Sequence, residues 1–146
     1  MNKDHLIEAV ELFKSGFNCS QSVLAAFCEE YGLPVETAFR IACPFGGGIG
    51  GSGRTCGALT GGLMVVGLKY GPASGSDTGA KNLAREKTRM LIDNFIKSHG
   101  SCECNDLVGF DRSRMTSSEL KAKLQYFHMV CPEFLATVVS FLEEEL

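Results

Sequence analysis

The chain has 146 residues, a net charge of −3 and an ordinary globular composition, with 45% hydrophobic and 21% charged residues. A chain of this size buries roughly two thirds of its unfolded surface in one core, so we expect a single domain over residues 1–146 that needs neither a disulfide nor a metal to fold. The pI near 5.6 argues against the basic face of nucleic-acid-binding domains, and we expect no nucleic-acid partner.

Two features of the sequence indicate the cellular compartment of the protein. The first eight residues include Asp4 and Glu8 and lack the basic start and apolar segment of a signal peptide. The longest apolar stretch, residues 58–68, is interrupted by Thr60 and two glycines and falls short of the about 20 residues that cross a bilayer. We therefore expect a cytoplasmic protein with no membrane partner.

The N-terminal part of the chain has the pattern of three helices. We expect these over residues 4–14, 19–31 and 35–42. Apolar side chains at three- and four-residue spacing indicate the first helix, and Gly16 ends it. Asn18 is a good N-cap for the second helix, and Pro34 suits the start of the third.

A glycine-rich loop, residues 46–53, leads into a central helix over residues 56–70. This helix is apolar on nearly every side, which indicates burial. Each glycine within it costs about 1 kcal/mol relative to alanine, so we expect these glycines to allow close approach of neighbouring helices or a ligand. A glycine-faced helix also leaves room for a second copy of the chain, and a homodimer stays open.

The remaining chain is predicted to be helical as well. We expect helices over residues 77–98 and 117–127, a single turn near 104–109, and a last helix over 133–145. The inward face of the long helix is expected to comprise Leu83, Met90, Leu91, Phe95 and Ile96. Pro132 suits the first position of the last helix. The sequence thus predicts an all-α bundle of six or seven helices around the buried, glycine-rich central helix.

The chain contains seven cysteines. Structural disulfides are rare in a reducing cytoplasm, so these thiols are expected to be metal ligands or redox groups. The four at predicted helix starts are Cys19, Cys56, Cys104 and Cys131. Unpaired amides and the helix dipole favour the thiolate there, and the thiolate binds metals, attacks disulfides and is oxidised.

The other three cysteines have weaker signals. Cys28 lies inside a helix beside Phe27, where a small buried hydrophobic residue is the simpler interpretation. Cys43 precedes the glycine-rich loop and is either a core residue or a spare thiol. Cys102 forms a Cys-x-Cys pair with Cys104 and could replace or assist it.

The glycine-rich loop also matches phosphate-binding patterns formally. Residues 48–53 fit G-x-G-x-x-G, but no strand precedes them, and Arg54 stands where a P-loop has lysine, so we set nucleotide binding aside. Glycine amides at a helix start can still hold an anion, with Arg54 as its counter-charge. We expect Gly53, Arg54, Gly57 and Gly61 to lie against the bound group.

Two histidines lie close to these cysteines in the sequence. His99 precedes Cys104 by five residues and is either a zinc ligand or a polar group at a helix end. His128 precedes Cys131 by three residues and could tune that thiol. No Ser-His-Asp set or carboxylate pair can be assembled from the sequence.

The chain resembles the C_GCAxxG_C_C family of redox-active proteins. The motif Cys-Gly-Ala-x-x-Gly is complete at residues 56–61, and the resemblance extends over Asn18 with Cys19, the glycine-rich loop, residues 104–111 and Cys131. The four cysteines of the family pattern fall on the four selected above. Members resemble the iron–sulfur part of split-Soret cytochromes, but this chain has no C-x-x-C-H for covalent haem.

The resemblance implies a small redox protein, either an electron carrier or an oxidoreductase, in which Cys19, Cys56, Cys104 and Cys131 bind an iron–sulfur cluster. Its electrons would come from an unidentified redox partner protein. Two alternatives stay open. One is metal-free thiol–disulfide chemistry, with Cys56 as the nucleophile and another of the four as the resolving thiol. The other is a structural zinc site with the four cysteines as its ligands.

Overall fold

The computed structural model describes residues 4–146, which form eight α-helices, three short 3-10 helices and no β-strand. The α-helices are α1 (His5–Lys14), α2 (Cys19–Phe27), α3 (Val35–Ala42), α4 (Gly57–Tyr70), α5 (Thr78–His99), α6 (Cys104–Val108), α7 (Ser117–Ala122) and α8 (Leu124–Glu145). The predicted all-α fold is confirmed. The described residues contain more helices than the six or seven predicted, because the single turn expected near 104–109 forms the short helix α6.

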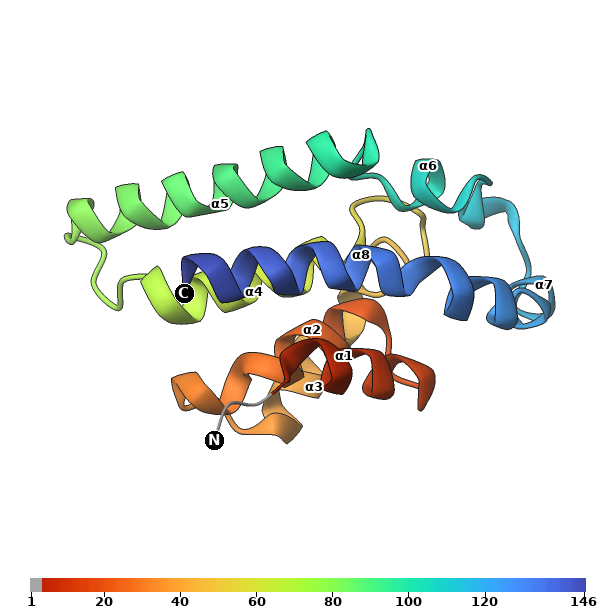
Figure 1. Cartoon of the computed structure of the whole chain (residues 1–146), viewed down its shortest axis with the longest axis horizontal. Coiled ribbons are helices and arrows are strands. Elements are labelled where there is room, and N and C mark those ends of the chain that lie inside the picture. Colours follow the sequence, from red (N-terminus) through yellow and green to blue (C-terminus); the bar gives the residue numbers. More distant parts are fainter. Residues whose placement is uncertain (1–3) are drawn as a thin grey trace.

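The helices lie in three tiers, with α5 on one side, α4 and α8 in the middle and α1 to α3 on the other side (Figure 1). As predicted, α4 is central and packs against α2, α5 and α8. A Cβ added at Gly61 would lie 2.7 Å from the Ser20 carbonyl oxygen on α2, and one at Gly62 would lie 2.5 Å from Val138 on α8. Gly61 and Gly62 allow neighbouring helices of the same chain to pack closely. They therefore give no support to a homodimer, which stays a prediction.

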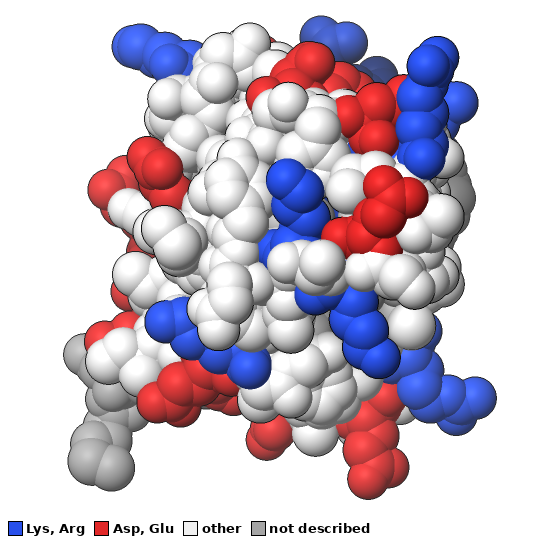
Figure 2. All heavy atoms as spheres, turned by 90° about the vertical axis from the view of Figure 1, so that its right-hand side faces the viewer, with Lys and Arg blue, Asp and Glu red and all other residues white. Residues whose placement is uncertain are grey.

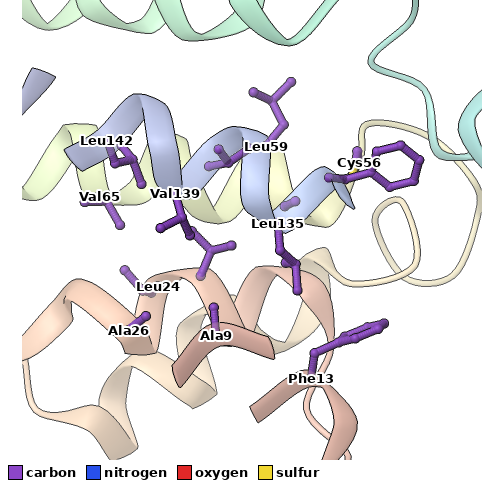
Figure 3. Packing of buried hydrophobic residues seen from close by; sticks show 14 of the residues in the cluster. Ala9, Phe13, Leu24, Ala26, Cys56, Leu59, Val65, Leu135, Val139 and Leu142 are labelled. Atoms are coloured by element: carbon purple, nitrogen blue, oxygen red, sulfur yellow. The ribbon is translucent and has the colours of Figure 1, made fainter. Parts of the chain in front are cut away.

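Apolar side chains from the middle tier and the α1–α3 tier form the core. Leu135 and Val139 on α8 point toward Ala9 of α1 and Leu24 of α2, with α4 behind them (Figure 3). All four of these side chains are at most 1% exposed. This packing fixes the ends of α1, α2, α4 and α8, which meet at the end of the molecule where α6 lies (Figure 1).

The last helix begins earlier than the sequence predicts. Cys131 and Pro132 lie inside α8, which starts at Leu124 after a break at Lys123, so the prediction that they open a helix over 133–145 is wrong. A proline in a helix interior costs about 3 kcal/mol because it removes one backbone hydrogen bond. Seven buried Phe, Leu and Val side chains of α8 offset this cost, since each contributes about 1.5–3 kcal/mol on burial.

The inward face of α5 is narrower than predicted. Leu91 and Phe95 are fully buried, but Leu83, Met90 and Ile96 are 41%, 37% and 39% exposed, so their predicted inward position is wrong. Because α5 forms an outer tier over α4 and α8 (Figure 1), only one stripe of its surface is covered.

The structure also bears on the predictions about membranes and export. Within residues 4–146, no helix combines the length and hydropathy that crossing a membrane requires. The signal-peptide prediction uses the first eight residues, of which residues 1–3 lie outside the described part of the chain.

Candidate functional site

Cys19 is the first residue of α2, and a local motif fixes its place. The Asn18 side chain accepts a hydrogen bond from the Gln21 backbone N–H at 2.9 Å, and the Gln21 side chain accepts one from the Asn18 backbone N–H at 2.9 Å. Such a capping box satisfies two otherwise unpaired amides of the first turn. Asn18 also donates to the Cys43 carbonyl oxygen at 3.0 Å, which ties this helix start to the chain before the glycine-rich loop.

Cys56 is the N-cap of α4, at the end of the glycine-rich loop. Gly48 shows why this loop needs glycine. Its φ is +72°, and a Cβ there would lie 2.6 Å from the Arg54 backbone nitrogen and 2.7 Å from Cys104 Cβ. Only glycine combines this left-handed backbone with so close an approach, so the loop lies directly against Cys104.

The segments that carry Cys56 and Cys104 are joined by backbone hydrogen bonds. The N–H of Cys56 donates to the Cys102 carbonyl at 2.8 Å, and the N–H of Cys104 donates to the Arg54 carbonyl at 2.6 Å. An isolated antiparallel bridge pairs Thr55 with Glu103. Cys104 is the first residue of α6, so these bonds hold two helix starts next to each other.

Cys131 reaches the same place from the interior of α8. Its side chain shares a hydrogen bond with that of Cys19, which connects α8 to the start of α2. The position of Cys131 thus depends on helix packing and not on a helix start. The other three cysteines do lie at helix starts, as predicted.

All four cysteines of the motif line one cavity of about 420 Å³. Gly47, Gly48 and Gly57 contribute backbone to its wall, and the ends of α1, α2, α6 and α8 supply most of the rest. The wall is otherwise mostly apolar, and no Asp or Glu of the described chain lines it. The structure therefore brings four separate parts of the sequence to one enclosed group of thiols.

Three residues expected at the bound group lie elsewhere. Gly53 and Gly61 do not line the cavity; they make room for the Asn105 side chain and for α2, respectively. Arg54 is exposed and also lies outside the wall. Of that predicted set, Gly57 alone is in the wall, where a Cβ would lie 3.1 Å from Cys19 Cβ.

The remaining cysteines stay outside the cavity wall. Cys28 is fully buried, as predicted for a core residue, Cys43 is exposed, and Cys102 is half-buried. Cys19, Cys43, Cys56, Cys102, Cys104 and Cys131 are free thiols. Cys102 contributes its backbone carbonyl to the site by accepting from Cys56, while its sulfur is not part of the wall.

The two histidines have different positions. His99 is the last residue of α5; its Nε2 lies 2.8 Å from Thr137 Oγ1 and its ring packs between Phe95 and Phe134. That is the polar helix-end position and not a place in the cavity wall. His128 does line the cavity, with its ring edge against Phe13.

Arg112 is the site residue that sequence reasoning missed. It lies in the 3-10 helix η3 (Arg112–Arg114) and lines the cavity with the four cysteines. Its guanidinium is 4.6 Å from the Phe127 ring centroid and hydrogen-bonds the Cys104 side chain. No spacing rule points to an arginine on a short surface turn, because contacts between distant segments set its position.

Burial dominates the acidity of two of the thiols. It raises the pKa of Cys56 to about 12, although the nearby backbone N–H groups of Ala58 and Leu59 oppose the shift. Burial also raises the pKa of Cys104, against the opposing charge of Arg112. Without a bound group both thiols are protonated at neutral pH, so the helix-start effect that the sequence suggested is outweighed here.

Cys19 and Cys131 behave as a pair. Their shared hydrogen bond, with Cys19 as donor, lowers the pKa of Cys131 and raises that of Cys19. The positive charge of Arg112 also lowers the pKa of Cys131. Of the four thiols, Cys131 is the one whose surroundings favour the thiolate.

Thiols are ligands of two different kinds of metal centre. Among residues 4–146, no group of three or more His, Cys, Asp or Glu side chains is close enough together to hold one metal ion. A tetrahedral zinc site needs all four sulfurs around one ion. In an iron–sulfur cluster each thiolate binds a different iron or shares one of two, so the ligands stand farther apart. Four thiols around one cavity supply the ligand chemistry of both kinds of centre.

Comparisons with known proteins agree with the cysteine pattern. The family model described as "Putative redox-active protein (C_GCAxxG_C_C)" matches residues 17–145. An Archaeoglobus fulgidus protein described as uncharacterized is 29% identical over 106 residues, which cover 68% of this chain and 70% of that protein. No solved structure matches the chain significantly.

Proposed function

We propose, from the premise that this chain belongs to the C_GCAxxG_C_C family of redox-active proteins, that its four motif cysteines bind an iron–sulfur cluster for electron transfer. One observation carries the proposal: Cys19, Cys56, Cys104 and Cys131 come from four separate segments and line the same cavity. A cluster bound there would accept one electron from a donor protein and pass it to an acceptor.

The chain's own residues would bind and shield this group. The four thiols release their protons on binding, because metal ligands must be thiolates. The backbone N–H groups of Ala58 and Leu59, which lie near the Cys56 sulfur, would be available as hydrogen-bond donors to a thiolate ligand. Apolar side chains such as Phe127 and Phe134 in the cavity wall would limit the access of water.

The proposed setting is the cytoplasm, where a reducing environment keeps the thiols available. The electron donor and acceptor would be separate redox proteins. The face of the molecule in Figure 2 carries charges of both signs, scattered over a mainly uncharged surface. Such a surface gives no preference for a mainly acidic or a mainly basic partner protein.

The test is anaerobic reconstitution with ferrous iron and sulfide, followed by assays of iron, acid-labile sulfide and visible absorption. Wild-type protein should show all three. Serine variants of each of the four motif cysteines should lose most of the absorption. C43S is the matched control, because Cys43 is exposed and outside the cavity. A wild-type protein with no iron or sulfide, or a C43S protein as impaired as C56S, would refute the proposal.

A second function has one observation in its favour. Cys19 and Cys131 share a hydrogen bond, and the pKa of Cys131 is lowered. This pair, and not Cys56 with its pKa of about 12, would form a disulfide if the protein works without metal. Two thiols would then release two protons and pass two electrons to an oxidant such as a disulfide. A purified apoprotein with a reversible Cys19–Cys131 bond would support this alternative.

A further inference from the structure

Arg112 is a cation held in the cavity wall without a carboxylate partner. Its Nε is buried and has no hydrogen-bond partner among the described residues. None of the ion pairs of the described chain includes it, whereas its neighbour Arg114 pairs with Asp111 at 3.2 Å. Arg112 is half-buried, and even partial burial of a charge without an opposite charge is costly, so this position favours an anion in the cavity.

A backbone hydrogen bond, a ring contact and the space left by a glycine position Arg112. The backbone N–H of Arg112 donates to Asn105 Oδ1 at 2.8 Å, and the guanidinium lies over the Phe127 ring. The glycine-rich loop leaves space for it, since a Cβ at Gly47 would lie 2.8 Å from Arg112 Nη2 and 3.2 Å from Cζ. Asn105 follows Cys104 directly, so the same turn positions a thiol and the cation beside it.

The guanidinium acts on two of the four thiols. It hydrogen-bonds the Cys104 side chain, and its charge also reaches Cys131. Lys14 also lines the cavity, but it is exposed. Of these two cations, Arg112 is therefore the one that lies beside the Cys104 thiol.

We propose that Arg112 compensates the negative charge of the thiolate-bound centre and thereby raises its reduction potential. This inference rests on the proposed function. A centre with four thiolate ligands gains one further negative charge when it accepts an electron, and a nearby cation stabilises the reduced form more than the oxidised form. The hydrogen bond to the Cys104 sulfur acts in the same direction.

The experiment is an anaerobic redox titration of the reconstituted protein, followed by visible absorption and EPR. R112Q and R112M both remove the charge; the first keeps a polar end and the second keeps apolar contact with Phe127. At the wild-type midpoint, the ratio of oxidised to reduced centre should rise about tenfold in these variants, a shift of about 59 mV to lower potential for one electron. R112K, which keeps the charge, should stay closer to the wild type.

R114Q is the matched control. It removes the same charge from the same turn, but its side chain is 86% exposed, and its potential should equal that of the wild type. Equal potentials in R112Q and R114Q would overturn the inference while leaving the cluster proposal intact. If R112Q and R112M both unfold while R112K folds, Arg112 has a structural role and the inference fails. Absence of a cluster in the wild type would overturn both proposals.

Discussion

The Cys19 side chain at the start of α2 donates a hydrogen bond to the Cys131 sulfur inside α8, and this contact makes the two thiols chemically unequal. A thiol that donates keeps its proton, whereas a sulfur that accepts is stabilised as the thiolate. The pair lies in the wall of a cavity shared with Cys56 and Cys104. Differences in thiol reactivity therefore test the geometry of the site directly.

In metal-free protein at about pH 7.5, iodoacetamide should modify Cys131 before Cys56. The thiolate is the reactive form; the pKa of Cys131 is lowered, and that of Cys56 is raised to about 12. Exposure does not decide the order, because the two residues are 6% and 3% exposed. Peptide mass mapping over time would measure it, with the exposed Cys43 as an internal reference. C19A, which removes the hydrogen-bond donor, should slow the reaction at Cys131, and earlier modification of Cys56 would contradict the prediction.

The metal-free protein should lose stability in alkali because of Cys56. Its pKa is about 12 in the folded chain, against 9.0 for an unperturbed thiol. Between these values the unfolded thiol loses its proton while the folded one keeps it, so the free energy of unfolding falls as pH rises from about 9 toward 12. The contribution is constant below the unfolded pKa.

Urea unfolding of wild type and C56A at several pH values from about 7.5 to 10.5 would measure this dependence. Burial also raises the pKa of Cys104, so both proteins should become less stable in alkali. The wild type should have the steeper dependence, and the difference between the two slopes belongs to Cys56. Parallel curves would show that Cys56 does not titrate abnormally.

The positions of Cys19, Cys56 and Cys104 could be predicted from sequence because local signals mark the helix starts beside them. Asn18 caps α2, and the glycine-rich loop ends at Cys56. The same reasoning predicts a helix start at Cys131, but this prediction is wrong, because Pro132 is inside α8. Cys131 lies at the cavity because tertiary packing of α8 outweighs the preference of proline for a helix start.

The sequence could not show which distant segments of the chain make contact. The position of Arg112 depends on its contacts with Asn105 and Phe127. Neither contact can be inferred from residue spacing in the sequence. The exposure of Leu83 depends on how many helices cover α5. The hydrophobic periodicity of α5 alone does not contain that information. Likewise, the glycines of α4 predicted close approach correctly, but not which helices approach.

The glycines of α4 allow a matched test of helix packing. G61A should destabilise the protein by about 1–3 kcal/mol, because the new methyl group would meet the Ser20 carbonyl oxygen at 2.7 Å and a rigid core resists added volume. G67A lies in the same helix with no atom within 4 Å of the new Cβ, and it should stabilise by up to about 1 kcal/mol through helix propensity. Thermal or urea unfolding would measure both. Equal effects of the same sign would contradict this assignment of the two positions.

The last prediction separates the two roles of the glycine-rich loop, backbone conformation and proximity to Cys104. Gly48 and Gly50 have similar left-handed backbones, with φ of +72° and +62°, so alanine at either should cost about 1–2 kcal/mol in strain. A Cβ at Gly50 meets no atom within 4 Å, whereas one at Gly48 would lie 2.7 Å from Cys104 Cβ. G48A should therefore also displace Cys104 and lower the iron bound after reconstitution, while G50A should keep nearly the wild-type amount. Iron content per folded protein, measured beside unfolding curves, distinguishes the roles, and equal iron loss in both variants would show that loop strain alone disturbs the site.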